Sequence, residues 1–577
     1  MTRDRSRFTP FRTLTDALRR LLPVLLLALP LAGNAYPDTE SQRPAKLPTL
    51  ELTGQVIYQL LIAEIAAHRG NMPVAAAAYM DLARATRDPR IAKRAAEMAL
   101  YARQPDNAME LARLWTEIEP ESVQAKQTLV GLLLAAKRLD EATAQLGKML
   151  ALQGEHLGES LPQLNRLLAR YPDKAAAANI VAQVTQPYEA LPEAHLARAQ
   201  AYLAADDGVQ ALAAIDAMQR LQPASEQAVL LKAQILQRSS SNQAQSALRS
   251  YLDAYPKARD VRIAYARALV GDRQYAAARR EYQALLEADQ NDRDAAYATA
   301  LLSLQLNELA AAEREFKRLL AAGFSEGNTV RLYLGQIAED SQRPEEALQW
   351  YGSVAPGEQY LAARARAATL LVKQGKLAAG RELLQQAAVA SVKDAASFAV
   401  AEAQLLAEAG QVGEAFDLLD RQLLAQPEDS QLLYESALLA EKLGRYETLE
   451  TRLRLLMRLK PDHAQAYNAL GYSLAERNQR LEEAQQLIEK ALALAPDDAF
   501  ILDSKGWVLY RRGDNSGALD FLQKAYGQRP DPEIAAHLGE VLWMLGRRTD
   551  AEKTWDAARQ ADPRNAVLAA TIKKFKP

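Results

Sequence analysis

Histidines and acidic residues are the side chains of this sequence that could carry out catalysis or hold a metal ion. The five histidines are scattered, and no two of them have the spacing of metal ligands. They are His68, His156, His195, His463 and His537. Acidic pairs such as Glu482-Glu483 stand at the start of a predicted helix, where negative charge complements the helix dipole. There is no cysteine and no recognisable catalytic motif, so we expect no enzyme activity, no cofactor and no metal.

Small residues and prolines recur along the chain at intervals of about 33 residues. The clearest copies lie near the C-terminus, where a set of four residues returns in the same order. The first set is Gly506, Gly513, Ala518 and Pro530, and the second is Gly539, Gly546, Ala551 and Pro563. Weaker copies extend upstream to Ala75, which gives about 14–15 units, and the stretch 152–195 is the least regular.

Each unit predicts two helices joined by a short turn. The small residue Gly506 lets the second helix approach closely, and Gly513 closes the first helix because glycine tolerates a left-handed backbone. Ala518 lies at the crossing, and Pro530 ends the unit because proline cannot continue a helix. Ala and Leu dominate and only 6% of residues are aromatic, which favours packed helices over sheets. We therefore predict an all-α fold, an α-solenoid of stacked hairpins with a concave face.

These spacings resemble the tetratricopeptide repeat, and the resemblance covers roughly residues 55–565. It implies that the first helix of every unit lines a concave groove in which partner peptides bind. Almost no residues remain outside the repeats to form a catalytic domain.

The sequence outside the repeats predicts export and a short leader. Residues 1–35 have several arginines, then the apolar run 21–31, then small residues up to Ala35, which is typical of a signal peptide. The apolar run is short for a membrane span, although an uncleaved anchor is the alternative. Residues 36–50 are rich in proline and polar side chains, so we expect a flexible leader. We predict that residues 51–565 form the repeat superhelix, and that residues 566–577 form a capping helix and basic tail.

The charge of the chain argues against nucleic acid as a partner. The formal net charge is −2, and the predicted signal peptide contains six arginines and two aspartates, so the remainder carries about −6. No polybasic tract is present, whereas phosphate binding needs clustered Lys and Arg. We expect protein or peptide partners, and no membrane span once the signal is removed. The sequence leaves the oligomeric state open.

Aromatic residues gather at predicted groove positions near the C-terminus. In tetratricopeptide geometry the residues one, four and five after the small residue face the groove, and aromatic side chains there provide large contact areas. The predicted groove residues are Tyr472, Glu476, Trp507, Tyr510, Arg511, Glu540, Trp543 and Met544. An alternative is that the aromatic side chains wedge between neighbouring hairpins and that Arg511 only complements the dipole of its helix.

The first predicted helix of the array is apolar on nearly all sides. A terminal helix is expected to have a polar outer face, but residues 56–67 are almost entirely apolar. We predict a partner-docking surface formed by Ile57, Tyr58, Leu61 and Ile65. Coverage by the leader or by the next hairpin is the alternative.

Two segments carry a narrower resemblance. One begins at Leu52-Thr-Gly-Gln-Val-Ile-Tyr and continues through Ala77–Arg90 and Arg94–Tyr101, and the other is Ile501-Leu-Asp-Ser-Lys-Gly-Trp-Val-Leu-Tyr510. Together they resemble a family of proteobacterial envelope proteins that includes the lipoprotein binding partner of the carboxyl-terminal processing protease. The resemblance implies an adaptor that holds the protease through its N-terminal helices and presents peptidoglycan hydrolases. This sequence departs from the family because it lacks the lipidated cysteine, so anchoring by that route is not expected.

We therefore expect a non-enzymatic periplasmic scaffold that binds a processing protease and its cell-wall hydrolase substrates. A repeat scaffold of an exopolysaccharide biosynthesis and export complex is the alternative. A sugar-transferring enzyme with a repeat front end would need a catalytic domain that the sequence does not provide.

Overall fold

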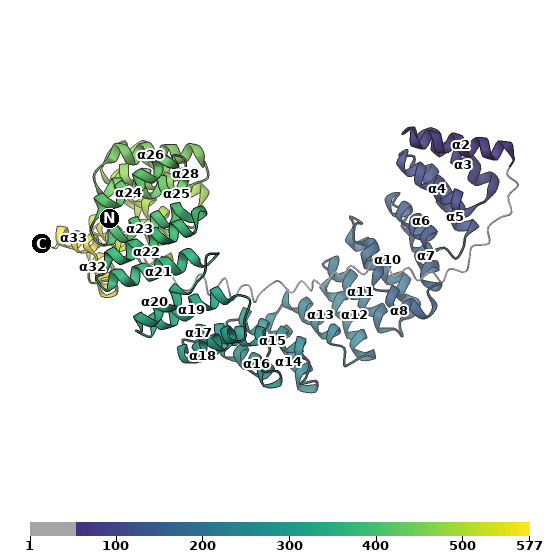
Figure 1. Cartoon of the computed structure of the whole chain (residues 1–577), viewed down its shortest axis with the longest axis horizontal. Coiled ribbons are helices and arrows are strands. Elements are labelled where there is room, and N and C mark those ends of the chain that lie inside the picture. The colour runs from purple at the N-terminus through teal and green to yellow at the C-terminus, as the bar shows by residue number, and fades with distance from the viewer. Residues whose placement is uncertain (1–52, 577) are drawn as a thin grey trace. The chain divides into compact units, whose positions relative to one another are not determined.

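The computed structural model describes residues 53–576, and the predicted signal peptide and leader lie outside these residues. The described residues form 32 α-helices, three short 3₁₀ turns and no strand. They divide into two compact units, residues 53–308 and 309–576, which we call the N-terminal unit and the C-terminal unit. Within each unit the helices stack in chain order as antiparallel hairpins (Figure 1). The prediction of an all-α solenoid is confirmed.

The N-terminal unit contains α2–α17. Its helices are α2 (Gly54–His68), α3 (Met72–Thr86), α4 (Pro89–Tyr101), α5 (Pro105–Ile118), α6 (Val123–Ala135), α7 (Leu139–Ala151), α8 (Leu157–Ser160), α9 (Gln163–Leu168), α10 (Lys174–Thr185), α11 (Pro192–Ala204), α12 (Gly208–Leu221), α13 (Glu226–Gln237), α14 (Ser241–Ala254), α15 (Arg259–Gly271), α16 (Tyr275–Ala288) and α17 (Arg293–Gln305). The stretch around α8 and α9 is irregular, because the 3₁₀ turn η1 (Gly154–His156) and two short helices stand where other units have one long helix. A second 3₁₀ turn, η2 (Gln186–Tyr188), follows α10.

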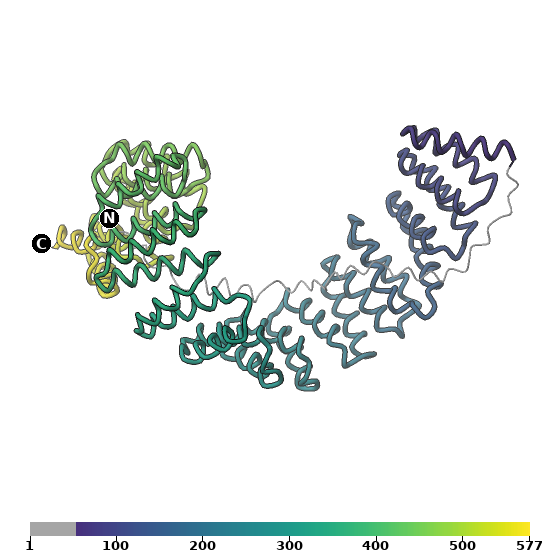
Figure 2. The backbone as a smooth tube through the Cα atoms, in the orientation of Figure 1, coloured from purple at the N-terminus to yellow at the C-terminus, as the bar shows by residue number. Residues whose placement is uncertain are grey.

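The C-terminal unit contains α18–α33 and is regular (Figure 2). Its helices are α18 (Leu309–Ala321), α19 (Gly327–Asp340), α20 (Pro344–Gly352), α21 (Tyr360–Lys373), α22 (Leu377–Ala390), α23 (Ala395–Glu408), α24 (Val412–Ala425), α25 (Ser430–Lys442), α26 (Tyr446–Leu459), α27 (Ala464–Glu476), α28 (Leu481–Leu494), α29 (Ala499–Arg511), α30 (Asn515–Gln528), α31 (Pro532–Met544), α32 (Arg548–Ala561) and α33 (Ala566–Phe575), with η3 (Val392–Asp394) before α23. The odd-numbered helices from α19 to α31 are the first helices of their hairpins, and the even-numbered ones are the second helices.

Hairpin turns use a left-handed residue where the first helix ends. At Gly513 the φ angle is 93°, and the amide of Asp514 donates to the carbonyl of Leu509 at 3.0 Å, which closes the last turn of α29. The equivalent turn after α15 has Arg273 with a φ angle of 60°. Non-glycine residues hold this conformation at several upstream turns, at an energetic cost that the surrounding hairpin offsets. This explains why the glycine pattern weakens upstream although the fold continues.

The small residues of the first helices lie where the two helices of a hairpin cross. A Cβ atom added to Gly506 of α29 would lie 2.5 Å from Cγ of Leu522 and 3.0 Å from the carbonyl oxygen of Ala518, both on α30. A side chain at Gly539 of α31 would similarly overlap the Trp555 ring of α32. Glycine is therefore required here for close packing, and not for backbone freedom.

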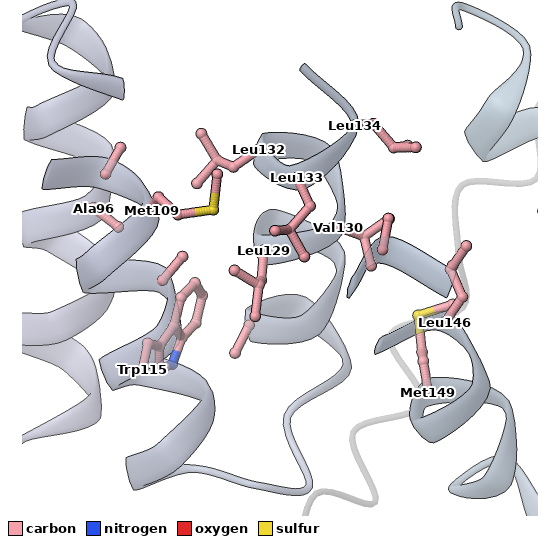
Figure 3. Close-up of a cluster of buried hydrophobic side chains, with 14 of the residues drawn as sticks. Ala96, Met109, Trp115, Leu129, Val130, Leu132, Leu133, Leu134, Leu146 and Met149 are labelled. Atoms are coloured by element: carbon pink, nitrogen blue, oxygen red, sulfur yellow. The ribbon is translucent and has the colours of Figure 1, made fainter. Parts of the chain in front are cut away.

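Large apolar side chains fill the space between hairpins. In the N-terminal unit Trp115 of α5, Leu129 and Leu133 of α6, and Leu146 of α7 are buried in one cluster (Figure 3). Met109 and Met149 lie in the same cluster. Burying side chains of this size stabilises each hairpin against the next by about 1.5–3 kcal/mol per residue.

The first helices form the inner side of the C-terminal unit. Each of the helices α21, α23, α25, α27 and α29 contacts the next first helix in the chain. The second helices make no comparable contacts with one another. Because the first helices approach each other more closely, the stack curves toward them, and the side chains that point away from the second helices line a concave surface. We call this surface the inner face.

Replacing Gly506 with alanine should destabilise the C-terminal unit by about 1–3 kcal/mol, because the new methyl group overlaps Leu522. Urea denaturation followed by circular dichroism measures this change in the free energy of unfolding. Gly527→Ala is the matched control, since Gly527 lies on α30 of the same hairpin with open space around it. That control should leave stability unchanged or raise it slightly. Equal stability of the two variants would contradict the crossing argument.

Candidate functional site

Polar bonds tie the aromatic residues of the inner face to neighbouring first helices. Nε1 of Trp507 on α29 donates to the Glu476 carboxylate of α27 at 2.8 Å. Arg511 donates to the backbone carbonyl of Glu476 at 3.1 Å, and its guanidinium lies over the Trp507 ring. On the other side of α29, the Tyr510 hydroxyl donates to Glu540 of α31 at 2.9 Å. The inner face is therefore a continuous network across three hairpins.

Burial and the negative charge of Glu540 raise the pKa of Tyr510 to about 12. Tyr510 therefore keeps its proton at physiological pH and remains a hydrogen-bond donor.

His537 on α31 is the centre of this network. Its Nδ1 lies 2.9 Å and 3.1 Å from the two carboxylate oxygens of Asp503 on α29, and its ring stacks on Trp507 with centroids 4.1 Å apart. Its Nε2 lies 3.4 Å from the hydroxyl of Tyr472, which belongs to α27. One imidazole thus connects three successive first helices, and this fixes the local curvature of the inner face.

Burial would lower the pKa of His537, but negative charge around it has the larger effect. The carboxylate of Asp503 contributes most, followed by the charges of Glu476 and Glu533, and the net result is a raised pKa. The proton on His537 is therefore held more tightly than in a free histidine.

The last helix, α33, adds further contacts to this network. Nζ of Lys574 on α33 lies 2.7 Å from Oε1 of Glu540, and Lys576 pairs with Glu552 of α32 at 2.7 Å. Phe575 packs against Trp543 and Trp555 with ring centroids 6.0 Å apart in each pair. The basic tail that the sequence predicts is thus held by ion pairs and by an aromatic contact.

The predicted groove residues differ in how far a partner could reach them. Trp507 is only 4% exposed, and Tyr472 and Glu540 are similarly buried between first helices. Tyr510, Arg511 and Trp543 are half-buried, and Glu476 is exposed. Met544 is 52% exposed at the end of α31. The buried members shape the inner face and the other members form its surface, and their role in binding stays a prediction.

Asp503, His537 and Lys574 belong to this network but were not predicted from the sequence as parts of it. In the sequence His537 is one of five scattered histidines, but it stands 34 residues after Asp503, which is close to the repeat period. Residues separated by one period occupy nearly equivalent places on successive hairpins, so they lie side by side. Comparing titratable residues one period apart would have revealed both the Asp503–His537 pair and the Glu540–Lys574 pair.

The N-terminal end has a different surface. Ile57, Tyr58, Leu61 and Ile65 are all exposed on the outer side of α2, and the exposed fraction of Tyr58 is 65%. We call these four residues the N-terminal face. Its helix is held from behind by the buried residues Ala63 and Ala66, and by a hydrogen bond from Tyr79 of α3 to Glu64.

The N-terminal face contains no acidic or basic side chain, because Glu64 and His68 are the only acidic and basic residues of α2. Beside it, residues of α2 and α3 that include Ile62, Val74 and Ala77 line a shallow open pocket.

Within residues 53–576 no three histidine, aspartate or glutamate side chains are grouped so that they could hold a metal ion. In the same part of the chain, no helix has the length and apolar character that crossing a bilayer requires.

Known proteins that are similar to this chain contain tetratricopeptide repeats. A tetratricopeptide repeat family model matches residues 263–323, 297–358 and 504–566. The TPR repeat-containing protein PA4667 of Pseudomonas aeruginosa is 33% identical over 525 residues, which cover 90% of this chain and 88% of that protein. The chain belongs to the tetratricopeptide repeat family. Repeats of this family form protein–protein interaction scaffolds, and the matches indicate no enzyme family.

Solved tetratricopeptide structures match parts of the chain. A thermophilic tetratricopeptide repeat protein of Thermus thermophilus is 23% identical and covers 31% of this chain and 97% of its own, with a TM-score of 0.29. A tetratricopeptide repeat protein of Parabacteroides merdae is 16% identical and covers 43% of this chain and 98% of its own, with a TM-score of 0.35.

The raised pKa of His537 predicts how stability depends on pH. A histidine whose pKa is higher in the folded state than its unfolded value of about 6.5 stabilises the fold fully below pH of about 6.5. This stabilisation is lost as the pH rises through the folded pKa. The melting temperature of the wild type should therefore exceed that of His537→Gln most at low pH, and the difference should shrink above neutrality.

Thermal unfolding followed by tryptophan fluorescence measures this difference, because Trp507 stacks on His537. His156→Gln is the control, since His156 is exposed in η1 and should leave the pH profile unchanged. A difference that is constant from acid to alkaline pH would contradict the ion pair.

Proposed function

We propose that this protein is a periplasmic adaptor that binds a carboxyl-terminal processing protease and presents cell-wall hydrolases to it. The observation that carries the proposal is the N-terminal face. Terminal helices of repeat arrays usually expose polar side chains, because they have no neighbour on one side. Here four large apolar side chains are exposed on α2 instead, which favours a protein partner at this end.

The chemistry of the N-terminal face suits a protein partner with an apolar surface. Its four side chains carry no charge, so covering them would desolvate no ion, and Asp81 is the one charged residue that lines the adjoining pocket. The open pocket beside Val74 and Ala77 could receive one anchoring side chain of the partner. Apolar anchors that enter small pockets supply most of the binding free energy in protein interfaces.

The cell-wall hydrolase would bind to the inner face of the C-terminal unit. Arg511 and Glu476 lie at its surface, and the buried Trp507 contacts both of them. A surface whose side chains are already fixed by hydrogen bonds loses little conformational entropy on binding. The two surfaces lie on different units, so both partners could bind the same chain.

Support for the location and the partners comes from sequence. The pattern of residues 1–35 is typical of a signal peptide, and the segments Leu52–Gly70 and Ile501–Tyr510 resemble envelope adaptors of the processing protease. The relative in Pseudomonas aeruginosa aligns over 90% of this chain, so the two proteins are similar over most of their length.

Replacing Ile57, Leu61 and Ile65 together with serine should abolish protease capture. Removing three apolar anchors should weaken an interface of this kind by at least about tenfold. Affinity purification from a proteobacterial envelope extract, followed by mass spectrometry, measures which proteins each variant retains. The control replaces Val209, Val389 and Leu424 with serine, because these residues are also exposed apolar side chains but lie on other helices.

Capture of the protease by the wild type and the control, but not by the serine variant, would support the proposal. Equal capture by all three proteins, or no protease at all, would contradict it. Recovery of polysaccharide-export components would instead favour a scaffold of an exopolysaccharide complex.

A further inference from the structure

The N-terminal face is a continuous apolar area on one helix. Beside its four residues, Leu60 of α2 is also 38% exposed. Contiguous exposed apolar side chains usually mark a surface that another segment or molecule covers. The proposed protease covers this face only while it is bound, and the chain itself supplies a second occupant that is always close by.

The chain enters α2 directly beside the N-terminal face. Thr53 is the N-cap of α2, and its side-chain oxygen accepts a hydrogen bond from the amide of Val56 at 3.3 Å. The ψ angle of Thr53 is 154°, which is extended, so the helix does not continue upstream of this residue. The segment before Thr53 therefore begins about one helical turn away from Ile57 and Tyr58.

The segment before Thr53 is long enough to cover the whole face. Residues 36–52 lie outside the described part of the chain and follow the predicted signal peptide. In a polyproline II conformation, which rises about 3.1 Å per residue, eight residues span about 25 Å. Helix α2 has 15 residues and is about 22 Å long, and the N-terminal face takes up about 12 Å of that length. The segment can therefore turn back and run along α2 with residues to spare.

The sequence of this segment contains an apolar stripe of suitable length. Pro44 and Pro48 favour polyproline II, both through their own φ angles and through the residues that precede them. Polyproline II has three residues per turn, so Pro44, Leu47 and Leu50 share one side. This stripe is about 19 Å long, which is enough to cover the N-terminal face from end to end.

The charges of the two surfaces are complementary. Asp81 of α3 is exposed, and it is the one charged residue that lines the pocket beside the N-terminal face. Arg43 and Lys46 are three residues apart, so they form a basic stripe next to the apolar one. Asp81 shares its pocket with Gln59, which is adjacent to Tyr58 on α2, so a lysine on the returning segment can reach its carboxylate.

We propose that residues 43–52 fold back along α2 and cover the N-terminal face until the protease displaces them. The apolar stripe lies against the exposed side chains of α2, and Lys46 lies beside Asp81. The inference rests on the proposed function for the identity of the displacing partner, whereas the contact itself is within one chain. Its effect is regulatory, because a tethered segment has a high effective concentration and only a partner with tighter contacts exposes the face.

Photocrosslinking within the purified chain tests the contact in the absence of any partner. The chain without its predicted signal peptide carries a photoreactive phenylalanine derivative in place of Tyr58, and it is irradiated at low concentration. Mass spectrometry should locate a crosslink within one chain, from position 58 to a residue between 43 and 52. The control has the same group at Val209, which is 78% exposed on α12 and should give no crosslink to the segment.

Substitutions in the segment should change the yield of this crosslink. Leu47→Ser and Leu50→Ser together should lower it at least about fivefold, because two apolar contacts are lost. The matched control is Tyr36→Ser with Pro37→Ser, which changes two residues of the same leader outside 43–52 and should leave the yield unchanged.

A charge exchange tests the predicted ion pair. Lys46→Asp should lower the crosslink yield by a smaller factor, because an exposed ion pair contributes modestly. Adding Asp81→Lys to this variant should restore the yield, because the pair forms again with its charges exchanged.

Several results would overturn the inference. They are the absence of a crosslink to residues 43–52, a crosslink from position 58 to a second copy of the chain, and equal yields from the double serine variant and its control.

Failure of this inference is distinguishable from failure of the proposed function, because the crosslink needs no protease. If the crosslink forms and no protease is captured from envelope extract, the adaptor function is wrong and the covered face stands. If the protease is captured and no crosslink forms, the reverse holds.

If both proposals hold, the double serine variant of Leu47 and Leu50 should bind the protease about tenfold more tightly than the wild type. This is the change expected when the face is uncovered for about one tenth of the time in the wild type. Unchanged affinity would overturn the regulatory effect.

Discussion

The structure depends on the close crossing of two helices within each hairpin. At Gly506 a single added carbon would overlap Leu522 of the facing helix, so the distance between the helices is set by the absence of a side chain. At this crossing one side of the first helix packs against the second helix, and the opposite side forms the inner face. The aromatic and acidic residues lie together on that face because the same crossing recurs with nearly the same period.

The inner face is held rigid by buried polar contacts. The network through His537 holds three first helices by contacts with Asp503, Trp507 and Tyr472, and these contacts are largely shielded from water. Buried polar groups that have partners fix one arrangement of helices, because any other arrangement would leave them unpaired. Exposed carboxylates such as Glu476 are thereby presented in fixed positions. The N-terminal face is the opposite case, since it is apolar and uncharged.

Repeat spacing was sufficient to predict the fold, because small residues and prolines report directly on crossings and helix ends. The pattern weakened upstream where residues such as Arg273 adopt the left-handed turn that glycine adopts elsewhere. The predicted site was harder to evaluate. Spacing placed Trp507 and Tyr472 at predicted groove positions, but it could not show that both side chains are buried. Burial depends on the curvature between hairpins, which no single unit encodes.

The central claim is that one chain has two separate binding surfaces, the N-terminal face and the inner face. Site-specific photocrosslinking tests it most directly: a photoreactive amino acid is placed at Tyr58 in one variant and at Glu476 in another, and both are exposed to envelope extract. The account predicts that position 58 captures the processing protease and position 476 captures a different protein, a cell-wall hydrolase. Capture of the same protein at both positions, or of the protease at position 476 alone, would contradict the account.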